Sequence, residues 1–343
     1  MSNVSMLAGG SARRTSPQGL IRGVLRAPSV DPSQALALVA DDLAQTEVEL
    51  RRIVESDVRA LPQIAHYLAD SGGKRLRPAL TALGARAVGV ESPSPILMCC
   101  GELIHLGSLL HDDVVDDGET RRGRPSAQML HGNAVAVLTG DHCVARALLA
   151  AIEHGGAAAG AGLARTVSEM SEGEVLQLQR AGNLDVTVEA YLEVITRKSA
   201  SLVAWCSSVG ALAIGDTRSA DALARFGHSV GIAFQIADDV LDFAEGTGKR
   251  AGADLRERKI TLPILHALGR VPGLKDRLRR AAPTEDELPG LFNAVRDSGA
   301  LDLALADAHG WADNAVAALQ ELPPTPARDA LEVLAAWLVE RTV

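Results

Sequence analysis

Apolar residues recur at helical spacing through most of the 343-residue chain. In DPSQALALVADDLAQTEVELRRIV, an Asp-Pro-Ser start signal precedes a helical face formed by Leu36, Val39, Leu43, Leu50 and Val54. Further helices are predicted near 76–89, 95–116, 131–152, 157–181, 187–214 and 219–243, with shorter ones between 262 and 341. Segments rich in Gly and Pro separate them.

Composition agrees with this helical pattern. Ala, Leu and Val dominate, aromatic residues make up only 3%, and strand-like alternation is scarce. We therefore expect an all-α protein. No fixed-period repeat or low-complexity linker divides the body, so we expect a single helical domain over residues 33–343 behind a disordered tail, residues 1–32.

The net charge limits which binding partners are expected, and the cysteine content indicates the cellular compartment. The net charge of −9 argues against nucleic acid, which needs an extended basic footprint. The four cysteines form no CxxC pair and have no His at zinc-finger spacing, which fits a reducing cytoplasm. The longest charge-free apolar stretch, 199–215, contains four serines and is too short to cross a bilayer, so we predict no transmembrane segment.

Two aspartate clusters carry the strongest chemical signal. Each has the DDxxD spacing, which puts the first and last carboxylates on one helical face, and each follows an apolar helix whose C-terminal dipole disfavours anions. Such placement indicates a bound cation. The clusters are Asp112, Asp113 and Asp116, and Asp238, Asp239 and Asp242.

The ligand chemistry favours Mg²⁺ with a diphosphate. Mg²⁺ is commonly held by one or two carboxylates together with phosphate oxygens, and arginine binds phosphate in bidentate fashion. Arginines follow the first cluster in GETRRGRP, and a second basic group, Lys74, Arg75 and Arg77, follows two glycines in GGKRLRP. An EF-hand fails because Val115 and Arg124 would occupy ligand positions, and GTGKR lacks the first glycine and the Ser/Thr of a P-loop.

These motifs together resemble those of the trans-type polyprenyl diphosphate synthases. The segments that carry the resemblance span roughly residues 35–340: GGKRLRP, IHLGSLLHDDVVDDGETRRGRPSA, LTGD, GEVLQLQ, RKSASL and FQIADDVLDFAEGTGKRAGADLRERKITLPIL. The resemblance implies a homodimer whose subunits are bundles of mostly antiparallel helices around a deep central cavity. The sequence departs from the family pattern at Arg258, where relatives often have Gly, and at Ser199, where Thr is usual.

The resemblance also assigns roles to individual positions. The six aspartates would carry Mg²⁺, three ions per active site, on an allylic diphosphate. Gln235 resembles the polar residue that lines the reacting carbons, and Lys259 is a further basic residue of the substrate site. The allylic diphosphate would meet Arg121, Lys198 and Lys249, and isopentenyl diphosphate would meet Lys74, Arg77, His105 and Arg122.

Product length should depend on Gly107 and Ser108, five and four residues before Asp112. Short-chain members of the family carry an aromatic floor at one of these places, so two small residues indicate an open tunnel and a long-chain product. Close helix packing is the other interpretation of this pair. Deeper residues, including Leu103 and Cys100, could still supply a floor.

Three other functions compete with this interpretation. A geranylgeranyl or farnesyl diphosphate synthase differs only in cavity depth. A terpene cyclase usually carries a different second metal motif, and a regulatory subunit typically has damaged aspartate motifs, whereas both motifs are intact here. Peripheral contact with a membrane stays open, because a long product has to be handed to lipid.

Overall fold

A computed structural model describes residues 31–121, 123–244, 252–280 and 283–340. The predictions for the tail up to residue 30, for Arg122 and for Lys249 lie outside these residues. The helices are α2 (Ser33–Ala37), α3 (Ala40–Ile53), α4 (Ala60–Ala69), α5 (Leu76–Ala87), α6 (Pro95–Val115), α7 (Ala127–His131), α8 (Asn133–Arg180), α9 (Val188–Ile195), α10 (Ser201–Ala213), α11 (Thr217–Leu241), α12 (Ala253–Arg256), α13 (Leu262–Leu268), α14 (Leu274–Arg280), α15 (Leu288–Arg296), α16 (Ala300–Leu319) and α17 (Pro326–Glu340).

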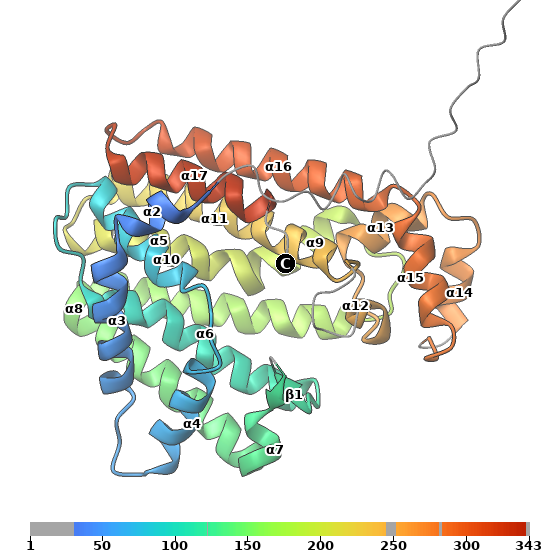
Figure 1. Ribbon diagram of the computed structural model, residues 1–343, viewed down its shortest axis with the longest axis horizontal. Coiled ribbons are helices and arrows are strands. Elements are labelled where there is room, and N and C mark those ends of the chain that lie inside the picture. Colours follow the sequence, from blue (N-terminus) through green and yellow to red (C-terminus); the bar gives the residue numbers. More distant parts are fainter. Residues whose placement is uncertain (1–30, 122, 245–251, 281–282, 341–343) are drawn as a thin grey trace, which may run out of the picture.

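The expected all-α fold is confirmed. In the described residues the only strands are β1 (Thr120–Arg121) and β2 (Arg124–Pro125), which pair antiparallel in a short hairpin after α6. A π-helical turn, η1 (Thr196–Ala200), joins α9 to α10. Helices α5, α6, α8, α10 and α11 pack against one another, and α16 and α17 run along α11 to cover one side of the bundle (Figure 1).

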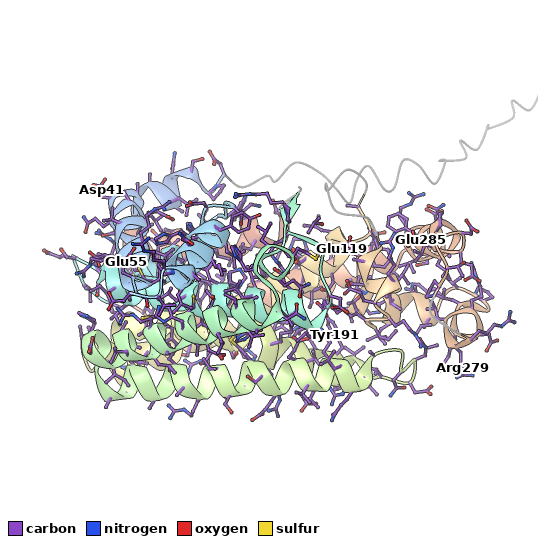
Figure 2. All side chains as sticks on the ribbon, turned by 90° about the horizontal axis from the view of Figure 1, so that it is seen from below. Asp41, Glu55, Glu119, Tyr191, Arg279 and Glu285 are labelled. Atoms are coloured by element: carbon purple, nitrogen blue, oxygen red, sulfur yellow. The ribbon has the colours of Figure 1, made fainter. Side chains whose placement is uncertain are left out.

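Helix α8 is two helices joined at Gly156. The backbone there has φ 80° and ψ 179°, and the EHGGAAAGAG segment predicted this break. The halves fold back on each other as a hairpin, seen as two green helical rows in Figure 2. Gly160 allows the close approach, because a Cβ there would lie 2.2 Å from Cγ1 of Ile152.

Among the described helices, α8 alone is long and apolar enough to cross a membrane by length and composition. The chain reverses at Gly156, so this helix is two halves that fold back on each other. Both halves pack on the bundle, where α8 contacts α6 and α10. Length and composition are therefore weak evidence for a membrane span here.

The apolar core lies along the helices that lead to the two aspartate clusters. Leu103, Ile104 and Leu110 of α6 are fully or almost fully buried, as are Ile232 and Ile236 of α11. Burying such side chains stabilises the fold by roughly 1.5–3 kcal/mol each. Both helices are thereby fixed, and so are the positions of their C-terminal ends.

Candidate active site

The first aspartate cluster ends α6. Asp112 and Asp113 lie in the last turn and Asp116 is the C-cap residue. Burial raises the pKa of Asp112, nearby Lys198 opposes this, and Glu174 and Asp116 reinforce it. The positive groups around this cluster therefore offset an unfavourable concentration of negative charge.

Asp113 is the most buried of these carboxylates, at 2% exposure. Arg121 of β1 folds back onto it and binds Oδ1 through Nε at 2.8 Å and Nη2 at 2.7 Å. The other oxygen, Oδ2, is buried and has no hydrogen-bond partner among the described residues. A buried carboxylate oxygen without a partner is costly, which makes it a natural cation ligand.

The second cluster ends α11 in the same way. Asp238 and Asp239 precede the helix end, and Asp242 is the C-cap residue. Asp239 accepts a hydrogen bond from the Tyr191 hydroxyl at 2.6 Å and one from the Gln235 amide at 2.9 Å. Gln235 in turn accepts a hydrogen bond from Ser199 Oγ at 2.8 Å. The hydroxyl at position 199, where Thr is usual in the family, therefore helps to orient Gln235.

Asp242 shapes the segment that follows. Its two oxygens accept the backbone N–H groups of Ala253 and Asp254 at 3.1 and 3.2 Å, which fixes the start of α12. Asp254 thereby joins the cluster. Burial raises the pKa of Asp254 well above its ordinary value, and the charges of Asp239 and Asp242 raise it further.

Lys259 links the two clusters. Its Nζ lies 3.5 Å from Asp116 Oδ2 and 2.5 Å from Glu257. Burial lowers the pKa of Lys259, but Glu257, Asp116 and Asp254 raise it by more, so the ammonium stays charged. Asp254 in turn feels the charges of Asp239 and Asp242, so the connection from Lys259 to the second cluster runs through Asp254.

Lys198 lies in η1 and pairs with Glu174 of α8. Gly173 makes this contact possible, because a Cβ at that position would lie 2.7 Å from the backbone nitrogen of Lys198. π-Helical turns often mark functional sites because they redirect a side chain. This turn directs Lys198 toward the first aspartate cluster, where its charge affects Asp112.

The second basic group divides into two parts. Lys74 is exposed, with Nζ 5.1 Å from the centre of the Trp337 ring, and Arg77 has a buried Nε without a hydrogen-bond partner among the described residues. Arg75 instead turns inward to Glu47 and Glu102. His105 lies half-buried on α6, seven residues before Asp112 and so on the same helical face.

Gly107 and Ser108, the two small residues before Asp112, lie in different surroundings. Gly107 touches α8, and a Cβ there would lie 2.9 Å from the carbonyl oxygen of Gly140 and 3.1 Å from Val144. Of the two interpretations of this pair, close helix packing is the one that fits Gly107. Ser108 is half-buried on the Asp112 face, and its hydroxyl donates to the His105 carbonyl at 2.9 Å. Their role in product length stays a prediction.

The donor set fits Mg²⁺. All six predicted ligands are carboxylates, the ligand type that Mg²⁺ prefers, and Asp113 presents an unpartnered buried oxygen. Within the described residues, no three His, Cys, Asp or Glu side chains converge tightly enough to form a complete metal cage. Mg²⁺ is commonly bound by one or two carboxylates together with waters and substrate phosphates, so it does not need a complete protein cage.

Three residues of the site escaped the sequence reasoning: Tyr191, Asp254 and Glu174. Asp254 lies in GADLRERK, within the quoted motif, but nothing in its spacing marks it as part of the cluster. Tyr191 lies 48 positions from Asp239. Only the packing of α9 beside α11 brings them together.

Comparison with known proteins gives a consistent result. The family model described as polyprenyl synthetase matches residues 58–295. Octaprenyl diphosphate synthase of Escherichia coli (strain K12) and heptaprenyl diphosphate synthase component 2 of Geobacillus stearothermophilus are each 37% identical to this chain, over 89% of it and 97% of the relative. A crystal structure of polyprenyl synthase from Caulobacter crescentus CB15, complexed with calcium and isoprenyl diphosphate, has 39% identity and a TM-score of 0.87. That alignment covers 92% of this chain and 99% of the other.

Proposed function

The chain belongs to the polyprenyl synthetase family and is a prenyl transferase, and from this premise we propose a specific reaction. It condenses isopentenyl diphosphate head-to-tail with an allylic prenyl diphosphate in a Mg²⁺-dependent reaction. Repeated condensation yields a long-chain trans-polyprenyl diphosphate. We place this activity in the cytoplasm, with peripheral contact to lipid where product leaves.

One observation carries the proposal. The two DDxxD clusters lie at the ends of buried helices, Lys259 pairs with Asp116 of the first, and the buried Asp113 has one oxygen without a partner among the described residues. Such a concentration of carboxylate charge is unfavourable unless cations neutralise it. Mg²⁺ bound by these aspartates would neutralise the diphosphate charge and act as a Lewis acid on its oxygens.

The protein's cations would then hold the allylic diphosphate as it departs. Arg121 and Lys198 already lie beside the first cluster, and Lys249 is the third predicted contact. Cleavage of the C1–O bond leaves an allylic cation, which the Gln235 side chain would face. The double bond of isopentenyl diphosphate attacks C1, and loss of a proton to the departing diphosphate restores an allylic product. Preorganised charges of this kind commonly supply much of an enzyme's rate enhancement.

Isopentenyl diphosphate would bind apart from the allylic diphosphate, at Lys74, Arg77, His105 and Arg122. The buried Nε of Arg77 supports this assignment, because it lacks a hydrogen-bond partner among the described residues and can donate to a phosphate oxygen. Lys74 is exposed and supplies a point charge.

The active form would be a homodimer built on α8. Leu138, Leu149 and Ile152 are 61%, 46% and 53% exposed and share one face of its first half. Exposed apolar side chains grouped on one helical face favour burial against a second copy. Light scattering should report a dimer for the wild type and for Val48→Glu on α3, and a monomer for Leu149→Glu; a dimeric Leu149→Glu protein would exclude this face.

The product-length proposal has its own test. Purified protein is incubated with Mg²⁺, isopentenyl diphosphate and farnesyl diphosphate, and products are sized by mass spectrometry after dephosphorylation. We expect six or more isoprene units from the wild type and shorter products from Ser108→Phe. A wild-type product that ends at geranylgeranyl diphosphate would favour the short-chain alternative, with a floor deeper than Ser108.

A further inference from the structure

The segment between α4 and α5 bends at an arginine. Residues 70–75, termed here the GGKR loop, contain Lys74 of the proposed isopentenyl diphosphate site, and Arg77 of that site follows in the first turn of α5. Arg75 between them has φ 47° and ψ 39°, in the left-handed region. Residues with a Cβ adopt this conformation at a cost and keep it only where the surroundings hold them in place.

The Arg75 side chain supplies the restraint. Its guanidinium binds both oxygens of Glu47 on α3, with Nη2 to Oε2 at 3.1 Å, and donates from Nη1 to Glu102 Oε1 on α6 at 2.7 Å. Nη2 also donates to the carbonyl of Ala69, the last residue of α4, at 3.1 Å. Arg75 and Glu102 are only 16% and 7% exposed, so solvent screens the pair little.

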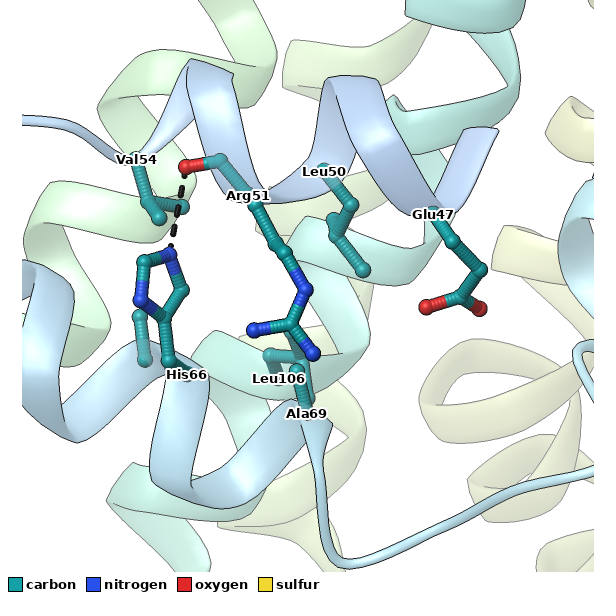
Figure 3. A pocket seen from close by; sticks show the side chains of 8 residues that line it. Glu47, Leu50, Arg51, Val54, His66, Ala69 and Leu106 are labelled. Atoms are coloured by element: carbon teal, nitrogen blue, oxygen red, sulfur yellow. Dashed lines mark hydrogen bonds between the residues drawn. The ribbon is translucent and has the colours of Figure 1, made fainter. Parts of the chain in front are cut away.

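Helix α3 holds the start of the loop as well. Arg51, one turn from Glu47, pairs with Asp70 at the end of α4. Figure 3 shows Arg51 reaching from α3 toward Ala69, with Glu47 further along the same helix. The Arg51–Asp70 pair is about half exposed and contributes little by itself, so the buried Arg75 contacts carry most of the restraint.

Arg75 lies between two residues of the proposed site. The Arg75 side chain is committed to Glu47 and Glu102, while Lys74 just before it is exposed and Arg77 just after it is half-buried. We propose that Arg75 is a positioning residue that acts through Lys74 and Arg77 to set the affinity for isopentenyl diphosphate, without touching substrate itself. This inference rests on the proposed function.

The test compares three variants. Arg75→Met removes every guanidinium contact, Glu47→Gln weakens only the α3 half and leaves Glu102 paired, and Arg52→Met is the matched control. Arg52 pairs with Glu49 on the exposed face of α3 and contacts no part of the loop. Kinetic constants for isopentenyl and farnesyl diphosphate are measured at saturating Mg²⁺.

We expect Arg75→Met to raise the KM for isopentenyl diphosphate about tenfold or more, with kcat and the KM for farnesyl diphosphate within about twofold. Glu47→Gln should raise the same KM by a smaller factor, and Arg52→Met should match the wild type. Equal rises in both KM values, or an unchanged KM for isopentenyl diphosphate in Arg75→Met and Glu47→Gln alike, would overturn the proposal.

Hydrogen exchange separates this inference from the proposed function. Loss of the restraint should speed amide exchange over residues 71–76 in Glu47→Gln and Arg75→Met but not in Arg52→Met. This readout needs no turnover. A wild type without condensation activity would refute the proposed reaction, whereas unchanged exchange in both loop variants would refute the restraint by Arg75.

Discussion

Asp239 shows how single residues of this site depend on their surroundings. Burial raises its pKa to about 7, and the charges of Asp238 and Asp242 add to this, against the opposing effect of hydrogen bonds from Tyr191 and Gln235. The pKa of the Asp239 carboxyl thus lies close to neutral pH. An ordinary aspartate in an unfolded chain titrates near pH ~3.9.

This shift predicts a pH dependence of stability in metal-free protein. Between about pH 4 and 7 the native state binds more protons at Asp239 than the unfolded state, so the free energy of unfolding falls as the pH rises through that window. The contribution is complete below about pH 4 and is lost above about pH 7. Asp239→Asn should flatten this part of the curve, leaving a slope from Asp254, whose pKa is raised as well.

The measurement is thermal unfolding from pH 4 to 8 in the presence of a chelator. Parallel curves for the wild type and Asp239→Asn would show that Asp239 has no raised pKa in the native state. Tyr191→Phe sharpens the comparison, because loss of its hydrogen bond should raise the pKa of Asp239 further and extend the slope to higher pH.

At the residue scale, sequence reasoning finds chemistry that depends on spacing and misses chemistry that depends on tertiary contacts. The DDxxD spacing located both clusters at helix ends. The inward turn of Arg75 could not be predicted, since nothing in GGKRLRP distinguishes its guanidinium from that of Arg77. Arg258 stands where relatives often have Gly, and its φ of 56° explains that preference.

At the scale of elements, the apolar periodicity predicted the long helices closely. The expected 95–116 and 219–243 correspond to Pro95–Val115 and Thr217–Leu241. The prediction of one helix over 187–214 was incomplete, because η1 interrupts it at Thr196–Ala200, and α4 was not predicted. The π-helical turn packs closely against Gly173, a tertiary contact that apolar periodicity does not predict.

Contact between α6 and α8 gives a prediction at this scale. A Cβ at Gly107 would lie 2.9 Å from the Gly140 carbonyl, so Gly107→Ala should destabilise the protein by about 1–3 kcal/mol through overpacking. Gly310→Ala on α16 is the matched control, since no atom lies within 4 Å of that Cβ position. It should be neutral or stabilising by up to ~1 kcal/mol.

Chemical denaturation of both variants provides the measurement. The expected order of stability is Gly310→Ala, wild type, Gly107→Ala. A Gly107→Ala protein as stable as the control would mean that the helices separate there without cost, which would weaken the packing interpretation and favour space beside α6.

At the scale of the whole molecule, the fold brings motifs that are far apart in the sequence together in one site. Segments near residues 112, 174, 198, 239 and 259 meet because α6, α8, η1, α11 and the segment after α12 converge at one end of the bundle. The sequence motifs predicted the aspartates, Lys198 and Lys259 of this group, but Glu174 and the pairing of Lys259 with Asp116 required the structure.

Condensation at controlled Mg²⁺ tests the central claim most directly. The rate of isopentenyl diphosphate incorporation into farnesyl diphosphate is measured across a Mg²⁺ series for the wild type, Asp113→Asn and Asp239→Asn. The account predicts no incorporation without a divalent cation, long products with it, and losses in kcat of roughly 10²-fold or more in both variants. Metal-independent incorporation, or full activity in both variants, would contradict it.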